Sequence, residues 1–206
     1  DLELLLGFGR EHAMDIYLQP KGAESVHKIF PQGSTERLYY SLPRFNLDMA
    51  FHPLDFTQVN ANINRQMLEK AVELLALEKT DTVLDLFCGL GNFTLPIATQ
   101  VAHVTGVEGS QGMVARGMEN AARNMLDNLT FISSDLTLSP DQHGWLKQGF
   151  DKVLLDPPRS GALEVLPAVL AAHPKRIVYV SCNPATLARD AAMLVAHGYK
   201  LVLAGA

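Results

Sequence analysis

Cysteine is scarce in this sequence: only two of its 206 residues, Cys88 and Cys182, are cysteines. Two cysteines form neither a disulfide framework nor a cysteine-based metal site, so we expect no metal and a reducing compartment, the cytoplasm. No apolar run reaches the roughly 18 residues that cross a bilayer, and no basic-then-apolar leader is present, which argues against a membrane protein. Basic residues are also few: 17 against 22 acidic residues give a net charge of −5, hence no global attraction to nucleic acid.

The remaining composition suits a globular α/β protein. Hydrophobic residues make up 48% of the chain and charged residues 19%, which are ordinary values for such a fold. The length allows one large domain and a smaller piece. The chain begins at Asp1 without a methionine and stops at Ala206, just after a strand-like run at 199–203, so we expect a fragment of a longer protein.

Residues 1–56 are expected to form a small β-rich subdomain. They lack a long helical period, and short alternating runs at Met14–Leu18 and Asn46–Phe51 indicate antiparallel strands between Pro and Gly turns. The pattern changes after Phe56, where apolar residues recur at helical spacing and predict a helix over 62–77.

Residues 57–206 form the second predicted domain, in which strands and helices alternate. Strands are predicted at 82–87, 103–107, 130–133, 152–155, 176–180 and 201–203, and helices at 92–100, 110–124, 161–172 and 185–197. Buried strands that alternate with helices indicate an α/β fold with a doubly wound, mostly parallel, Rossmann-like sheet. Ligands of such sheets bind at the carboxyl ends of the strands.

The first of these strands ends in a glycine turn that suits a nucleotide-like cofactor. Asp85 lies inside the strand, and Gly89 and Gly91 follow it, so the backbone can approach a ligand closely. The third glycine of the dinucleotide fingerprint is missing, which favours S-adenosylmethionine over NAD. Glu108 ends the second strand, where its carboxylate could accept both ribose hydroxyls.

Polar side chains also follow the next two strands. Asp135 comes after the third strand, where adenine-binding groups lie in such folds, although a lone Asp also suits a cap or a solvated loop. The fourth strand ends in Asp156-Pro157-Pro158-Arg159, and the two prolines make a stiff loop that holds Asp156 over the edge of the sheet. Arg159 could clamp a phosphate or form a surface ion pair.

Cys182 closes the fifth predicted strand and directly precedes Asn183 and Pro184. Asn is a good helix N-cap and Pro a favoured first helical residue, so the thiol is expected at a strand end facing a helix N-terminus. This position can lower a thiol pKa from about 8.5 toward neutrality and give a usable nucleophile. A lone cysteine at a strand end is otherwise core filler.

Four motifs together resemble the RNA (uracil-5)-methyltransferase family, in its order and spacing across nearly all of residues 45–203. They are Phe56-Thr57-Gln58-Val59-Asn60, the run Asp85–Phe93, Asp156-Pro157-Pro158-Arg159 and Ser181-Cys182-Asn183-Pro184. Within the family, three further segments are most similar to the branch that modifies 23S rRNA, and the tRNA-modifying branch is the nearest competitor. These segments are Ile16–Pro20, Phe150–Val153 and Pro184–Asp190.

The resemblance implies a class I S-adenosylmethionine-dependent methyltransferase that makes 5-methyluridine in 23S rRNA, or alternatively in tRNA, and acts as a monomer. It implies Cys182 as the nucleophile that adds to C6 of uracil, and Asp156 as a second catalytic residue close to the uracil. Phe56, Gln58 and Arg159 are the candidate substrate contacts. The implied S-adenosylmethionine contacts are Gln58, Phe87, Asn92, Glu108, Asp135 and Asp156.

The sequence departs from the family pattern at both ends. The family's amino-terminal oligonucleotide-binding domain and iron–sulfur cysteines are absent, so a cluster is expected only in a missing amino-terminal region. The family's carboxyl-terminal segment, with the last strand and a glutamate that acts as general base in the family, is absent too. We therefore expect this stretch to bind cofactor but to be inactive in turnover by itself.

Three other functions stay open at this point. An amino-methylating nucleic-acid enzyme could use the Asp-Pro-Pro loop to hold an exocyclic amine, in which case Cys182 would be superfluous. A non-catalytic S-adenosylmethionine-binding or RNA-scaffold module would need no nucleophile. An NAD-dependent dehydrogenase would be recognised by the cofactor that it binds.

Overall fold

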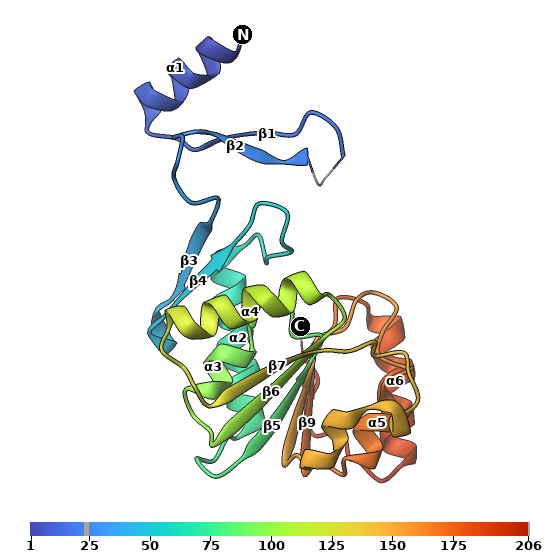
Figure 1. Ribbon diagram of the computed structural model, residues 1–206. Coiled ribbons are helices and arrows are strands. Elements are labelled where there is room, and N and C mark those ends of the chain that lie inside the picture. Colours follow the sequence, from blue (N-terminus) through green and yellow to red (C-terminus); the bar gives the residue numbers. More distant parts are fainter. Residues whose placement is uncertain (23–24, 206) are drawn as a thin grey trace.

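The computed structural model describes residues 1–22 and 25–205. Residues 23, 24 and 206, the last of which closes the second predicted domain, lie outside the described part. The centre of the protein is a five-stranded parallel sheet in the order β7-β6-β5-β8-β9 (Figure 1). The strands are β5 (Thr82–Leu86), β6 (His103–Glu108), β7 (Leu129–Ser133), β8 (Lys152–Leu155) and β9 (Arg176–Tyr179).

The predicted doubly wound fold is confirmed by this strand order. The chain builds the sheet outward from β5 to β7, then returns to the other side of β5 for β8 and β9. Asp85 is paired with Gly106 of β6 on one side and with Leu154 of β8 on the other. The order therefore reverses between β5 and β8, the point at which open α/β sheets bind their ligands.

Helices cover both faces of the sheet (Figure 1). On one face lie α2 (Ala61–Leu75), α3 (Thr94–Ala98) and α4 (Gln111–Arg123), and on the other α5 (Leu166–Ala171) and α6 (Pro184–Ala196). Val83 packs into the first layer and the adjacent Leu84 into the second, and neither is exposed. Because both faces are buried, the strands read as continuous apolar runs. Short 3-10 turns occur at Pro43–Phe45, Pro140–Gln142 and Gly144–Gln148.

The amino-terminal part contains two antiparallel hairpins, as predicted. β1 (Ile16–Leu18) pairs with β2 (His27–Phe30), and β3 (Leu38–Leu42) pairs with β4 (Leu47–Phe51). The second hairpin packs on the sheet domain, since Leu42, Leu47 and Met49 belong to the same core as α2 and α4. Helix α1 (Leu2–His12) was not predicted. Gly7 and Gly9 lower its intrinsic helix propensity, and four of its apolar residues, Leu2, Leu4, Leu5 and Phe8, are exposed.

The prediction of a strand at 201–203 is wrong. Leu201, Val202 and Leu203 are 69%, 91% and 53% exposed and carry no regular structure. An apolar run forms a strand only beside a neighbour that accepts its backbone hydrogen bonds, and among the described residues this run has none. Other boundaries shift by a few residues: the helix predicted from 161, for example, begins at Leu166. None of the helices in the described ranges has the length and apolar character to traverse a membrane.

Candidate active site at the carboxyl edge of the sheet

Backbone hydrogen bonds hold the carboxyl ends of the five strands together beyond the strands themselves. Four N–H groups donate to a carbonyl oxygen of the adjacent strand at 2.8–3.3 Å: Ser134 to Glu108, Phe87 to Val107, Asp156 to Leu86 and Val180 to Leu155. One edge of the sheet therefore carries five of the predicted site residues, each of which takes part in one of these bonds or lies within two residues of one that does. They are Phe87, Glu108, Asp135, Asp156 and Cys182.

The turn after β5 is built for close approach. Phe87 has a positive φ of 64°, a strained conformation for an aromatic residue that the surrounding structure must enforce. Gly91 has a φ of 93°, and a Cβ there would lie 2.5 Å from Leu95 and 2.9 Å from Phe131. Only glycine fits this position, so the predicted glycine turn has a packing reason as well as an open backbone.

Glu108 is bound to the glycine turn by its own carboxylate. Its Oε2 accepts a hydrogen bond from Gly89 N at 3.1 Å, and its Oε1 accepts one from Ser110 N at 2.9 Å. Each carboxylate oxygen has capacity for a second bond. The half-buried side chain is thus fixed in orientation and can still accept from the two hydroxyls of a ribose.

Asp85 lies beneath this turn and is fully buried. Its Oδ2 accepts a hydrogen bond from Thr94 Oγ1 at 2.6 Å, while its Oδ1 has no partner among the residues that the structure describes. Burial raises the pKa of Asp85 to about 8, and the charges of Asp156 and Glu108 add to the shift. An unpaired oxygen in such a place is costly and indicates a group that a ligand or an ordered water satisfies.

Asn92 is held by two side chains that the sequence analysis did not single out. It exchanges two amide hydrogen bonds with Asn64 of α2, at 2.9 and 3.2 Å, and its Oδ1 also accepts from Tyr40 Oη at 2.8 Å. These contacts fix the Asn92 amide beside the glycine turn and tie that turn to α2 and to the β3–β4 hairpin.

The Asp156 loop contains a half-buried carboxylate, Asp156, and an exposed guanidinium group, Arg159. Asp156 is half-buried and Pro157 is buried, whereas the Arg159 side chain is exposed. Burial raises the pKa of Asp156 to about 6, so the carboxylate is mainly ionised at neutral pH but retains a proton more readily than a surface acid. Arg159 is therefore free to meet a solvent-side partner such as a phosphate.

The two cysteines occupy opposite environments. Cys182 is exposed, whereas Cys88 is buried behind the glycine turn, with 5% of its surface exposed. Burial raises the pKa of the Cys88 thiol well above its usual value, and the adjacent carboxylates Asp85 and Glu108 act in the same direction. Only Cys182 has the accessibility that a nucleophile toward a large substrate needs.

The predicted cap after Cys182 is confirmed, and it has a second function. Asn183 is the N-cap of α6, with its Oδ1 accepting from Ala185 N at 3.1 Å, and Pro184 is the first helical residue. The Asn183 Nδ2 donates to the carbonyl oxygen of Arg159 at 3.0 Å, and Thr186 Oγ1 reaches the same oxygen at 3.3 Å. The loop with the thiol is thereby tied directly to the loop with Asp156.

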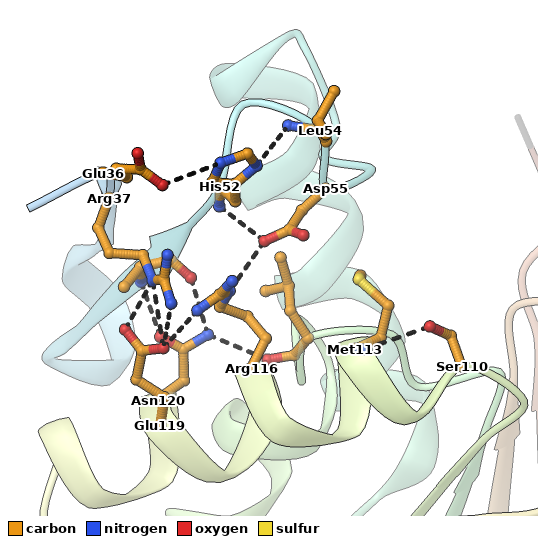
Figure 2. Close-up of polar contacts among 12 residues, drawn as sticks. Glu36, Arg37, His52, Leu54, Asp55, Ser110, Met113, Arg116, Glu119 and Asn120 are labelled. Carbon is orange, nitrogen blue, oxygen red and sulfur yellow. Dashed lines mark hydrogen bonds and ion pairs between the residues drawn. The ribbon is translucent and has the colours of Figure 1, made fainter. Parts of the chain in front are cut away.

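Phe56 and Gln58 lie on an exposed loop between β4 and α2, and Phe56 is 76% exposed. Figure 2 shows how the preceding residues anchor this loop to α4: Asp55 Oδ2 accepts from Arg116 Nε at 2.9 Å and from His52 N at 2.6 Å. Arg116 also pairs with Glu119. The loop thus presents Phe56 and Gln58 from a fixed base, although the described contacts do not bring either side chain to the strand ends.

Asp135 forms a local turn. Its Oδ1 accepts from Thr137 N at 2.9 Å and from Thr137 Oγ1 at 2.7 Å, and these bonds lower the pKa of the exposed Asp135 carboxyl. The Oδ2 of Asp135 accepts no hydrogen bond from any of the described residues. The structure therefore supports the loop interpretation of Asp135 and leaves its predicted cofactor contact as a prediction.

Several residues that support the site have no recognisable signal in the sequence. Tyr40, Asn64, Asp55 and Arg116 find partners 28 to 61 positions away. Asn120, which is fully buried on α4, has partners 70 and 30 positions away: it joins Ala50 of β4 to the Leu90 carbonyl of the glycine turn. Among the described residues, no group of three or more His, Cys, Asp or Glu side chains is placed to hold a metal ion.

The arrangement of strands and side chains at this edge of the sheet defines the class of protein. A glycine turn after the central strand, a fixed carboxylate after its neighbour and a chain reversal between β5 and β8 are the features of the Rossmann-like fold of S-adenosylmethionine-dependent methyltransferases. A crystal structure of the Pyrococcus abyssi tRNA (uracil-54, C5)-methyltransferase in complex with S-adenosyl-L-homocysteine superposes with a TM-score of 0.71. The two sequences are 29% identical over the superposed part, which covers 87% of this chain and 44% of the Pyrococcus abyssi chain.

Residues 45–200 match the sequence profile of the tRNA (uracil-5-)-methyltransferase family, and the chain belongs to this family. Proteins named 23S rRNA (uracil(1939)-C(5))-methyltransferase RlmD are similar over the whole chain, with 53% identity in Acinetobacter baylyi, 54% in Hahella chejuensis and 55% in Alkalilimnicola ehrlichii. The chain spans about half the length of these relatives, 45–47%.

Proposed function

We propose that the intact gene product that carries this chain methylates C5 of a uridine in 23S rRNA to give 5-methyluridine. The observation that carries the proposal is an exposed Cys182 on a loop that Asn183 ties by a hydrogen bond to the Asp156 loop, which follows β8 at the switch point of a methyltransferase sheet. The names of the relatives with 53–55% identity support 23S rRNA as the substrate. We further propose that the protein acts as a monomer in the cytoplasm.

The cofactor fits the residues of this edge. Glu108 offers two oriented acceptors for a ribose, and Asp85 Oδ1, which has no partner within residues 1–22 and 25–205, lies under the turn that would receive the ligand. Gln58, Phe87, Asn92, Asp135 and Asp156 are the further proposed contacts. When bound, S-adenosylmethionine supplies an electrophilic methyl group. The ionised Asp156 favours a positively charged ligand at this edge.

The proposed chemistry depends on Cys182. C5 of uracil is a poor nucleophile until a thiolate adds to C6, which forms a C–S bond and moves the ring electron pair toward C5. C5 takes the methyl group as the bond from that methyl to the cofactor sulfur breaks, which releases S-adenosylhomocysteine. A base then removes the C5 proton, the C5–C6 double bond re-forms and the thiolate leaves. Asp156 or Gln58 holds the uracil edge, Phe56 stacks on a flipped base and Arg159 pairs with a phosphate.

The test is methyl transfer from labelled S-adenosylmethionine by the intact gene product, with unmodified 23S rRNA and unmodified tRNA as parallel substrates. Nuclease digestion and chromatography should recover the label as 5-methyluridine from 23S rRNA. Label in an N-methylated nucleoside would indicate the amino-methylating alternative, and no transfer to any RNA would indicate a binding module.

The second candidate is a tRNA uracil-5-methyltransferase. The superposed Pyrococcus abyssi enzyme and the name of the matching family favour it. In the same assay this alternative predicts 5-methyluridine in tRNA and none in 23S rRNA.

A further inference from the structure

Asp190 is a fully buried carboxylate on α6 that is not among the predicted site residues. Its Oδ2 accepts hydrogen bonds from Ala162 N at 2.7 Å and from Tyr179 Oη at 2.6 Å, and its Oδ1 accepts from Arg189 Nε at 2.8 Å. A buried carboxylate is tolerated only with such a complete set of donors. The three donors come from three different segments of the chain.

These segments are the supports of the two functional loops. Tyr179 ends β9, three positions before Cys182, and Ala162 follows the loop that starts at Asp156. Arg189 adds a bond from its Nη2 to the carbonyl oxygen of Ser160 in that same loop, at 2.8 Å. The carboxylate of Asp190 therefore lies between the base of the thiol loop and the far end of the Asp156 loop.

The loop backbone packs closely against the carboxylate of Asp190. Gly161 has a φ of 84°, and a Cβ there would lie 2.5 Å from Arg189 Nη2 and 2.6 Å from Asp190 Oδ2. The loop backbone is thus pressed against the carboxylate, where only glycine fits. Burial raises the pKa of Asp190, but the hydrogen bonds from Arg189, Tyr179 and Ala162 outweigh it and keep the pKa below the usual value.

We propose that Asp190 is a positioning residue that fixes the Cys182 loop relative to the Asp156 loop through its bonds to Tyr179 and Ala162. The inference rests on the proposed function, because addition of a thiolate to C6 requires the thiol and the group that holds the base to be in register. Displacements of about 1 Å in such an arrangement can cost about 100-fold in rate. Asn183 and Thr186 tie the same loops near the surface, and Asp190 ties them in the core.

The experiment compares two matched tyrosine variants of the intact gene product. Tyr179→Phe removes the hydroxyl that donates to Asp190, and Tyr199→Phe removes a hydroxyl that donates to the Pro174 carbonyl at 2.8 Å, beyond the other end of α6. Three quantities are measured: the rate of covalent adduct formation with 5-fluorouridine RNA, the affinity for S-adenosylmethionine and the midpoint of thermal unfolding. Asp190→Asn is measured in the same way where it folds.

We expect Tyr179→Phe to slow adduct formation about tenfold or more, while cofactor affinity stays close to that of Tyr199→Phe. The thermal midpoint should fall more in Tyr179→Phe, because the lost bond is to a buried charge, but both variants should remain folded at the assay temperature. Equal adduct rates in both variants and the unaltered protein would overturn the positioning role, and so would equal slowing in both variants. Failure of the unaltered protein to form any adduct would instead overturn the proposed function, so the two failures are distinguishable.

Discussion

The anchoring of the Phe56–Gln58 loop to α4 can be tested by removing the ion pair between Asp55 and Arg116 (Figure 2). Both side chains are largely buried, at 15% and 13% exposure. Arg116→Gln does not strand Glu119, because Arg37 also binds that carboxylate at 3.0 Å. The variant loses the charge-assisted hydrogen bonds of Arg116 to Asp55 and to Glu119, and the loss of the bond to Asp55 alone should cost about 1.5–3 kcal/mol of unfolding free energy.

The assay is a double-mutant cycle with Arg116→Gln, Asp55→Asn and the double variant, followed by thermal unfolding of the intact gene product. A coupling energy of about 1–2 kcal/mol is expected between the two positions. Lys70→Gln is the control, because its pair with Glu73 is exposed (54% and 69%) and should contribute about 0.5 kcal/mol or less. A coupling energy near zero, or an equal cost for Lys70→Gln, would refute the assignment of this pair as the anchor of the loop.

Three further variants test other parts of the site. Glu108→Ala removes both proposed ribose acceptors and should weaken S-adenosylmethionine binding by about 1–3 kcal/mol, and calorimetry with wild-type affinity would reject the contact. Asp85→Asn should gain stability over the unaltered protein as pH rises from about 4 to 8 and no further above 8, because the native state keeps a proton that the unfolded state has lost. A pH-independent difference in thermal midpoint would contradict the raised pKa. Gly91→Ala should destabilise by about 1–3 kcal/mol through its clash with Leu95 and Phe131, whereas Gly109→Ala, with open space around it, should change the thermal midpoint little; equal effects would argue against the packing role of Gly91.

The parallel sheet was predictable because burial on both faces leaves a signal in the chain itself. Strands such as β8 (Lys152–Leu155) consist almost wholly of apolar residues, and each is followed by a turn or a polar residue that marks its end. The cap at Asn183 was predictable as well, because an Asn followed by Pro at the start of a helical pattern marks a helix N-terminus in the sequence itself. Local signals therefore located the edge of the sheet on which the candidate site lies.

Other features depended on partners far along the chain. The bond between Asp55 and Arg116 joins residues 61 positions apart, and the bond between Ala162 and Asp190 joins residues 28 apart. No periodicity encodes such pairs, because the fold alone brings them together. The run at 201–203 shows the converse error, in which an apolar pattern suggested a strand although the described residues offer it no pairing partner.

The central claim, that Cys182 is the nucleophile of uracil C5 methylation, is tested most directly by mapping a trapped adduct. The intact gene product is incubated with S-adenosylmethionine and RNA containing 5-fluorouridine, in which fluorine at C5 prevents the final elimination, and the digested complex is analysed by mass spectrometry. Cys182 should carry the nucleotide in the unaltered protein and in Cys88→Ala, and Cys182→Ala should form no adduct. An adduct that persists in Cys182→Ala, or that maps to the buried Cys88, would contradict the account.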